Sequence, residues 1–162
     1  MITIQRERFA AVMDELPPLL EDHWREVALH QETVPLKPDF KRYVAGCESG
    51  RVLTLTARDD GHLIGYSIFL LSVHLHYSTC LVATNDVLFL AKSYRSGTTA
   101  GIRLIRESEA EIERECAGRG AASVRVLWHV KPKNDWSPIL KRMGYEQEEI
   151  IMGKLLGEPN GH

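Results

Sequence analysis

The segment LFLAKSYRSGTTAG, residues 88–101, decides the fold prediction, because it runs from an apolar strand directly into the start of a helix. The first N–H groups of a helix lack intrahelical partners, and the helix dipole adds partial positive charge there. Small residues let a ligand approach the main chain, so such a loop suits a pyrophosphate. The same pattern also fits an ordinary turn with a helix cap. The phosphate-loop pattern G-x-x-x-x-G-K-[ST] and the dinucleotide pattern G-x-G-x-x-G are both absent.

The residues before this loop predict an antiparallel meander. Segment 52–57 is rich in β-branched residues, segment 63–76 is long and mostly apolar, and segment 80–90 follows as a third predicted strand, with short turns between them. The turn between the first two is Asp59-Asp60-Gly61, which is typical of a tight hairpin. Three strands joined in this way are expected to pair antiparallel with their sequence neighbours.

The residues after the loop predict a helix over 99–117, a strand over 124–130, a short helix over 135–143 and a last strand over 145–156. A strand–helix–strand unit favours a right-handed crossover and local parallel pairing. Upstream, the periodicity predicts a strand at 2–4 and helices over 6–16, 19–30 and 39–45. We therefore predict an α/β (α+β) fold. It has a mixed, mostly antiparallel sheet of six to seven strands with helices on both faces, in one domain over 1–156 with a flexible tail at 157–162.

The composition of the chain argues against several classes of partner. The chain has 162 residues, 20 of them basic and 22 acidic, and no dense Lys/Arg tract, so a nucleic-acid partner is not expected. No apolar stretch approaches the ~20 residues that span a bilayer, so no membrane association is expected. Three widely spaced cysteines without C-x-x-C spacing indicate free thiols in a reducing compartment, and we expect a cytoplasmic protein. His and Cys spacings give no metal-binding pattern, so no metal is expected.

The loop and its position resemble the GNAT superfamily of acyltransferases, whose signature at this junction is R/Q-x-x-G-x-G/A. Arg95 and Ala100 match its first and last positions, while Thr98 stands where the first glycine is expected. Alternatively, Gly101 is the final motif glycine and the loop is one residue longer. A second match is the segment KRMGY, residues 141–145, which resembles the family's K-x-G-F/Y segment. The resemblance covers residues 50–156 well, and residues 1–49 only by element order.

Within the superfamily the chain looks most like the phage-encoded GNAT-like proteins. The segments that carry this narrower likeness are TARDDG at 56–61, HLHY at 74–77, Asp86 and MGY at 143–145. For such a protein the cytoplasm would be that of the host cell.

The resemblance implies that acetyl-CoA is the co-substrate. It would lie where two central parallel strands, 85–91 and 124–130, splay apart. The pantetheine would pair with backbone at Phe89, Leu90 and Ala91, and Asn134 and Ser137 would flank the thiol. Arg95 would add a charged contact to the pyrophosphate. The backbone N–H groups that would meet the pyrophosphate belong to Ser96, Gly97, Thr98, Thr99, Ala100, Gly101 and Ile102.

Transfer of an acyl group to an amine needs a base. Asp86 is the first candidate because it lies on the strand expected to line the opening, although an Asp there can also be a structural acceptor. His74 and His76, two apart on a predicted strand, share one face. They and Tyr77 form the second candidate, and His129 on the next central strand is the third. The tyrosine that protonates the leaving thiolate in many family members would fall at Leu140 here.

The sequence thus predicts an N-acyltransferase, acting by direct attack with general-base assistance on a primary amine of a small molecule, protein or peptide. The alternative is a noncatalytic GNAT-fold binding protein or a phage virion-associated protein, which is favoured by Leu140 in place of the tyrosine and by Thr98 in place of the motif glycine. His23 and Trp24 are candidates for the wall of the acceptor site. A homodimer would follow if the predicted strand 145–156 paired across two copies.

Overall fold

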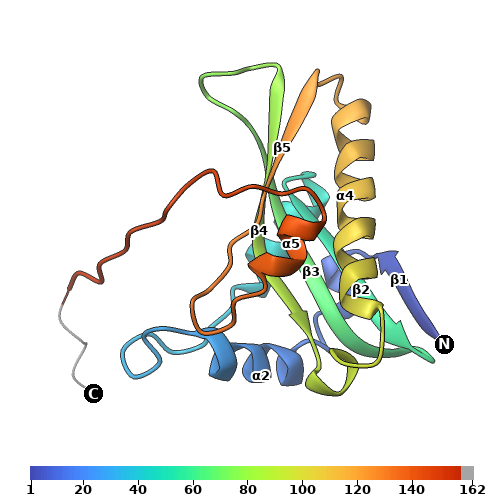
Figure 1. Ribbon diagram of the computed structural model, residues 1–162, viewed down its shortest axis with the longest axis vertical. Helices are drawn as coiled ribbons and strands as arrows, with labels where there is room; N and C mark the ends of the chain where they lie inside the picture. The colour runs from blue at the N-terminus through green and yellow to red at the C-terminus, as the bar shows by residue number, and fades with distance from the viewer. Residues whose placement is uncertain (158–162) are drawn as a thin grey trace.

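The computed structural model describes residues 1–157, which form a five-stranded sheet in the order β1-β2-β3-β4-β5 (Figure 1). The strands are β1 (Ile2–Arg6), β2 (Val52–Asp59), β3 (His62–Val73), β4 (Cys80–Leu90) and β5 (Ser123–Leu127). The first three neighbouring pairs are antiparallel and β4 pairs parallel with β5. The predicted meander and the predicted parallel pair are both confirmed.

The helices are α1 (Phe9–Val12), α2 (Pro17–Val27), α3 (Phe40–Glu48), α4 (Ala100–Gly118) and α5 (Ser137–Arg142), with a short 3-10 turn, η1, at Lys92–Tyr94. The helix predicted over 6–16 is shorter than expected. Arg6 still pairs with Leu55 in the sheet, and the Glu7 N–H donates to the Thr54 carbonyl, so the chain stays extended before α1 can begin.

Helices cover both faces of the sheet. Successive side chains of a strand point to opposite faces, and apolar residues on both faces need to be buried. On one face, α4 buries Leu104 and Ile112 against β2, β3 and β4. On the other, α1 places Phe9 and Val12 against Tyr66 of β3, with α3 packed beside them. Figure 1 shows α4 running along the sheet and α2 crossing its lower end.

The prediction of six to seven strands was wrong. Segment 145–157 forms no strand, and it runs away from the sheet in Figure 1. Its start is acidic: Arg125 of β5 pairs with Glu148 and Glu149 through side chains, which does not build a backbone ladder. Ile151 and Met152 beyond them are exposed. The predicted tail, 157–162, lies outside the described residues from Glu158 onward.

Two irregularities in β4 shape the interior. The pairing of β3 with β4 passes from Ile68–Val87 to Phe69–Asn85, which leaves Asp86 as the extra residue of a β-bulge. The parallel pairing of β4 with β5 ends at Thr84 and Leu127, although β4 continues to Leu90. The two strands thus separate immediately before the bulge. Among residues 1–157, no helix is long and apolar enough to cross a membrane.

Candidate functional site

A narrow cleft of about 40 Å³ opens where β4 and β5 stop pairing. One wall is the stretch of β4 from Asn85 to Leu88, and the other is the chain that follows β5. Helix α2 covers the cleft with His23 and Val27. The residues contributed by the chain after β5 are His129, Lys131, Asn134 and Trp136. The opening beyond the paired part of β4 and β5 therefore has polar groups on both walls, and a helix lies across it.

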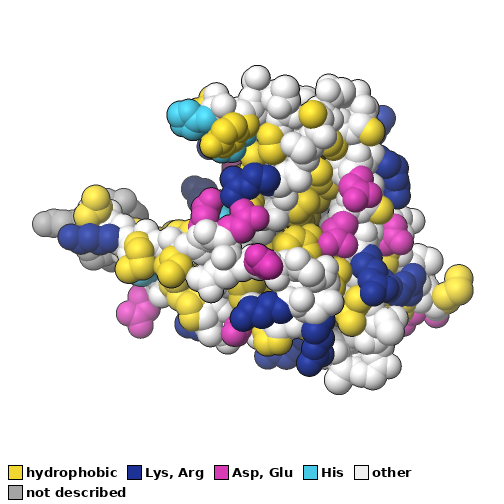
Figure 2. Space-filling model, turned by 45° about the horizontal axis from the view of Figure 1, so that its top comes forward, with side chains coloured by type: hydrophobic (Ala, Val, Ile, Leu, Met, Phe, Trp, Pro, Cys, Tyr) yellow, Lys and Arg dark blue, Asp and Glu magenta, His cyan; other side chains and the backbone are white. Residues whose placement is uncertain are grey.

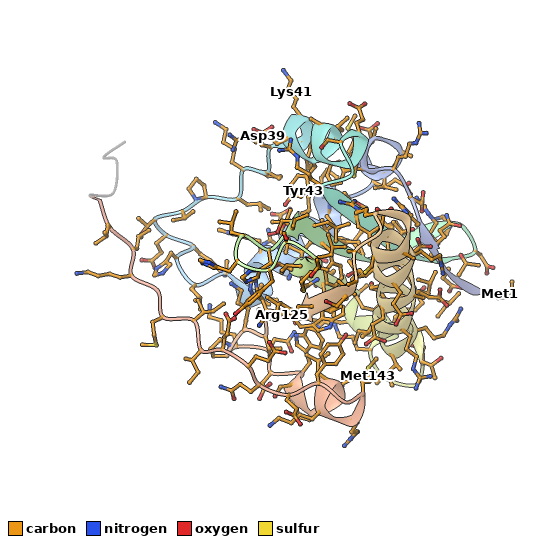
Figure 3. All side chains as sticks on the ribbon, turned by 90° about the horizontal axis from the view of Figure 1, so that it is seen from above. Met1, Asp39, Lys41, Tyr43, Arg125 and Met143 are labelled. Atoms are coloured by element: carbon orange, nitrogen blue, oxygen red, sulfur yellow. The ribbon has the colours of Figure 1, made fainter. Side chains whose placement is uncertain are left out.

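Asp86 lies at the cleft because the bulge turns its side chain out of the regular alternation. Its side chain is exposed, although its neighbours Val87 and Leu88 are apolar. Tyr43, which reaches from α3 toward the sheet (Figure 3), donates a hydrogen bond of 2.7 Å to Asp86 Oδ2. Burial, and then the Asp86 carboxylate, raise the pKa of Tyr43, so Tyr43 keeps its proton and orients the carboxylate.

His23 contributes a neutral imidazole to the cleft. Burial lowers its pKa from 6.5 to about 4. Its Nδ1 lies 3.0 Å from the hydroxyl of Tyr66, and its ring stacks on Phe89 at 5.0 Å. Burial raises the pKa of Tyr66, so this hydroxyl stays protonated, and Nδ1 is the acceptor placed to receive its hydrogen bond. We assign the remaining proton of the imidazole to Nε2 on this basis.

His129 and Asn134 line the cleft opposite Asp86, whereas Ser137 does not. Ser137 begins α5, and its N–H donates to the Asp135 carboxylate at 2.9 Å. Asn134 donates at 2.9 Å to Glu26 on α2. Of the two residues expected to flank the thiol, the structure brings Asn134 to the cleft and leaves Ser137 outside its lining.

His74, His76 and Tyr77 lie elsewhere. The predicted strand 63–76 was too long: β3 ends at Val73, and these residues form the exposed turn before β4. Their rings contact one another, with His74 and Tyr77 at 4.7 Å. Because β4 begins at Cys80, the turn is about 20 Å along the strand from Asp86 at ~3.3 Å per residue. The structure does not bring this trio to the cleft.

The segment 97–100 borders a second hollow, an open depression of about 550 Å³ at the N-terminus of α4. Thr98 accepts from the Ala100 N–H at 3.3 Å and donates to the Tyr94 carbonyl at 2.6 Å. Thr99, the N-cap residue, makes no side-chain cap. The first intrahelical bond shown runs from the Arg103 N–H to the Thr99 carbonyl, so the N–H groups of Gly101 and Ile102 point out of the helix end.

A basic residue of α4 that the sequence analysis did not single out also borders this hollow. Arg103 lines it, and its Nη1 donates to the Ile2 carbonyl at 3.2 Å. Its place one turn into the helix was a signal that could have identified it. Gly97 has φ +75, a conformation that favours glycine, and a Cβ there would meet no atom within 4 Å. The hollow thus has an open approach and one guanidinium, and the free N–H groups of Gly101 and Ile102 follow its lining residue Ala100 in the chain.

Arg95 is engaged away from this hollow. Its Nη1 and Nη2 contact the two oxygens of Glu26 at 2.6 and 2.9 Å, and its Nε donates to the Leu90 carbonyl at 2.7 Å. The guanidinium lies over the Phe89 ring, 5.1 Å from its centroid. Residue Ser96, next along, is exposed and does not line the hollow.

The backbone of β4 alternates between its two neighbours. The Ala91 N–H donates to the Ile64 carbonyl, so the main-chain groups of Ala91 and Phe89 point toward β3. Those of Leu88 and Leu90 then point to the side from which β5 has departed, and Arg95 already occupies the Leu90 carbonyl. Leu88, which the sequence reasoning did not single out, is the residue with main-chain groups facing the cleft.

The short helix α5 buries Leu140, which is 6% exposed, where a tyrosine would be expected. Tyr145 donates at 2.6 Å to Glu109 of α4 and packs against Trp128, so it joins elements together rather than entering the cleft. Within residues 1–157 no group of three His, Cys, Asp or Glu side chains is placed to hold a metal ion. Figure 2 shows charges of both signs interspersed on the face in view.

Comparison with known proteins identifies the fold. No family model matches the sequence, and a search of curated proteins gives no match. Among solved structures, a GCN5-related N-acetyltransferase from Ralstonia eutropha JMP134 is similar at 16% identity and TM-score 0.70, over 97% of this chain and all of that chain (100%). A ribosomal-protein-alanine N-acetyltransferase from Brucella melitensis biovar Abortus 2308 is similar at 16% identity and TM-score 0.69, with 97% and 100% covered.

A third similar structure is an aminoglycoside acetyltransferase from an uncultured soil metagenomic sample, solved in complex with sisomicin. It shares 13% identity at TM-score 0.68, over 96% of this chain and 97% of that chain. These identities show the fold alone. The chain has the GNAT fold with a sheet of five strands among its described residues.

Proposed function

We propose that the chain is an N-acyltransferase that transfers an acetyl group from acetyl-CoA to a primary amine. The observation that carries the proposal is the end of the β4–β5 pairing at Thr84 and Leu127. It opens a cleft lined by Asp86 and His129, and the β4 strand beside it is followed by η1 and then by the N-terminus of α4, where Thr99 makes no side-chain cap. The proteins with the same fold named above are acetyltransferases, two of them named as N-acetyltransferases, which supports this reaction class.

The donor fits the two hollows in sequence. The pyrophosphate would lie at the helix N-terminus, against the N–H groups of Gly101 and Ile102, with Arg103 nearby. Main-chain groups of Leu88 would pair with the pantetheine amides. The thioester would then reach the cleft beside Asp86. Arg95 is already paired with Glu26. We therefore propose that Arg95 fixes the conformation of the loop and does not contact the phosphates directly.

The chemistry needs few groups. The neutral amine nitrogen bonds to the thioester carbonyl carbon, the C–S bond breaks, and the thiolate leaves. Asp86, oriented by Tyr43, takes the proton from the amine nitrogen, directly or through a water. His129 on the opposite wall is the next candidate for that proton. Nε2 of His23 supplies a neutral N–H group that can donate a hydrogen bond to the substrate. Because the imidazole stays neutral near pH 7, His23 does not take the amine proton itself.

The acceptor is a primary amine of a small molecule, protein or peptide. The similar structures include enzymes named for each kind, a ribosomal protein and an aminoglycoside. The competing proposal, a noncatalytic binding or phage virion-associated protein, draws on one observation. Leu140 is buried where a thiolate-protonating tyrosine is expected, and Tyr145 is committed to Glu109.

The test is release of free thiol from acetyl-CoA across a panel of amines, with wild type and Asp86→Asn. Asparagine keeps an oxygen for Tyr43 to donate to, so the fold is expected to persist while the base is lost. We expect kcat to fall about a hundredfold, a usual magnitude for a general base, with CoA affinity unchanged. Asp22→Asn on the exposed side of α2 is the matched control.

CoA binding without turnover on any amine would favour the noncatalytic alternative. If Asp86→Asn turned over as fast as wild type at every pH, Asp86 would not be the general base, and His129 would be the next candidate.

A further inference from the structure

The side chain of Glu26 contacts both edges of the opening. It lies on α2 and is 16% exposed. Its two oxygens accept from Arg95, which lies in the segment after β4, at 2.6 and 2.9 Å. Its Oε1 also accepts from Asn134, in the chain that follows β5, at 2.9 Å. One carboxylate thus joins the segment after β4 to the segment after β5.

The contacts of its partners extend this link to the cleft. Arg95 is fixed by its Nε bond to the Leu90 carbonyl and by its position over Phe89. Asn134 lies in the cleft lining itself. Beside it, Lys133 donates to the Ala28 carbonyl just past α2, so the same loop is held to α2 at a second point. His23, one helical turn before Glu26, faces the cleft from the same side of α2.

We infer that Glu26 is a positioning residue: it holds the two edges of the β4–β5 opening at a fixed spacing, so that a CoA thioester between them is aligned with the cleft. The inference rests on the proposed function. Arg95 acts through Glu26, and the two side chains form one unit. Removing either should therefore have nearly the same effect as removing both. The Arg95 hydrogen bonds lower the pKa of Glu26, which keeps the carboxylate charged at neutral pH.

The first measurement is hydrogen–deuterium exchange of the protein without ligand, which needs no activity. Glu26→Gln removes the charge and keeps the shape. We expect faster amide exchange in both segments 91–97 and 131–136, and no change in the turn at 74–79. Glu21→Gln is the control, because Glu21 pairs with Arg25 on the exposed side of the same helix. Unchanged exchange in either segment would overturn the inference.

The second measurement is CoA affinity by calorimetry for Glu26→Gln, Arg95→Gln and the double variant. We expect each single variant to weaken binding roughly tenfold and the double variant to be no weaker than the singles, as for strongly coupled residues. Glu21→Gln should bind as wild type does. Tighter or unchanged binding by Glu26→Gln would overturn the inference. Losses that add in the double variant would show that Arg95 contributes to CoA binding independently of Glu26 and would overturn it as well.

The two measurements separate this inference from the proposed function. If wild type binds no CoA, the proposed function fails, and the role of Glu26 in aligning a thioester fails with it, whatever the exchange data show. If wild type binds CoA and Glu26→Gln binds it equally well, the inference alone fails.

Discussion

At the scale of single residues, the site depends on where protons are held. Tyr43 and Tyr66 keep their protons because burial raises the pKa of each, and each donates to a group of the cleft: Tyr43 to Asp86 and Tyr66 to His23. His23 is consequently a neutral group whose pKa of about 4 lies well below its ordinary value. This depression has a measurable effect on stability.

A group whose pKa is lower in the folded state than in the unfolded state binds fewer protons when folded. For His23 the window runs from about 6.5 down to about 4, so the free energy of unfolding should fall as pH drops through it. Between pH 7 and pH 5 we expect wild type to lose about 2 kcal/mol more than His23→Gln does. Urea unfolding of both proteins at the two pH values measures the difference, and equal losses would contradict a buried neutral histidine.

At the scale of elements, α4 and α2 position the two ends of the site. The first turn of α4 presents Ala100 and Arg103 to the hollow, next to the N–H groups of Gly101 and Ile102 at the helix end. Helix α2 places His23 and Glu26 on the face toward the cleft, while Glu21 and Arg25 pair on its exposed side. A helical stripe of this kind is visible in the sequence, but which face meets a site is decided by packing.

Arg103 should contribute to donor binding by attraction to phosphate. We expect Arg103→Gln to weaken CoA binding several-fold at low salt, by about 1 kcal/mol, and the loss to shrink as salt screens the charge. Arg106→Gln, on the same helix and outside the hollow, serves as the control. Calorimetric titration of CoA at two ionic strengths measures the loss of affinity at low salt and its decrease at higher salt. Equal affinity of the two variants would remove Arg103 from the site.

The sequence predicted elements well where periodicity is strong, as for β4 and α4. It could not show the bulge at Asp86, because a bulge depends on the register of β3 against β4. It predicted a strand at 145–156, but a strand also needs a neighbouring strand edge to pair with, and that is a tertiary property. The Glu26–Arg95 pair, which joins residues far apart in the chain, was invisible for the same reason.

At the scale of the whole molecule, ion pairs tie the N-terminal segment to the sheet. Arg58 on β2 is 12% exposed at its side chain and contacts Glu7 and Glu15, both at 2.7 Å. These contacts hold the chain between β1 and α2 over the end of the meander. Helix α2 follows this segment in the chain. The ion pairs of Arg58 therefore help to fix the position of α2, which covers the cleft.

Removing one partner of such a poorly exposed pair leaves a carboxylate without compensation. We expect Arg58→Gln to lower the free energy of unfolding by about 3 kcal/mol. Arg114→Gln breaks a pair with Glu111 whose arginine is 60% exposed, and should cost less than about 1 kcal/mol. Chemical denaturation compares the two. A small loss in both would mean that the N-terminal segment is held by its apolar contacts alone.

The central claim is that CoA binds at the N-terminus of α4, and its most direct test is calorimetric titration of CoA into wild type, Gly97→Asn and Gly97→Asp. Both substitutions impose the same strain at the positive φ of Gly97, where nothing crowds an added Cβ, and they differ in charge. We predict one CoA per chain in wild type, and binding at least about tenfold weaker in Gly97→Asp than in Gly97→Asn, because a carboxylate repels the pyrophosphate. No binding by wild type, or equal affinity of the two variants, would contradict the claim.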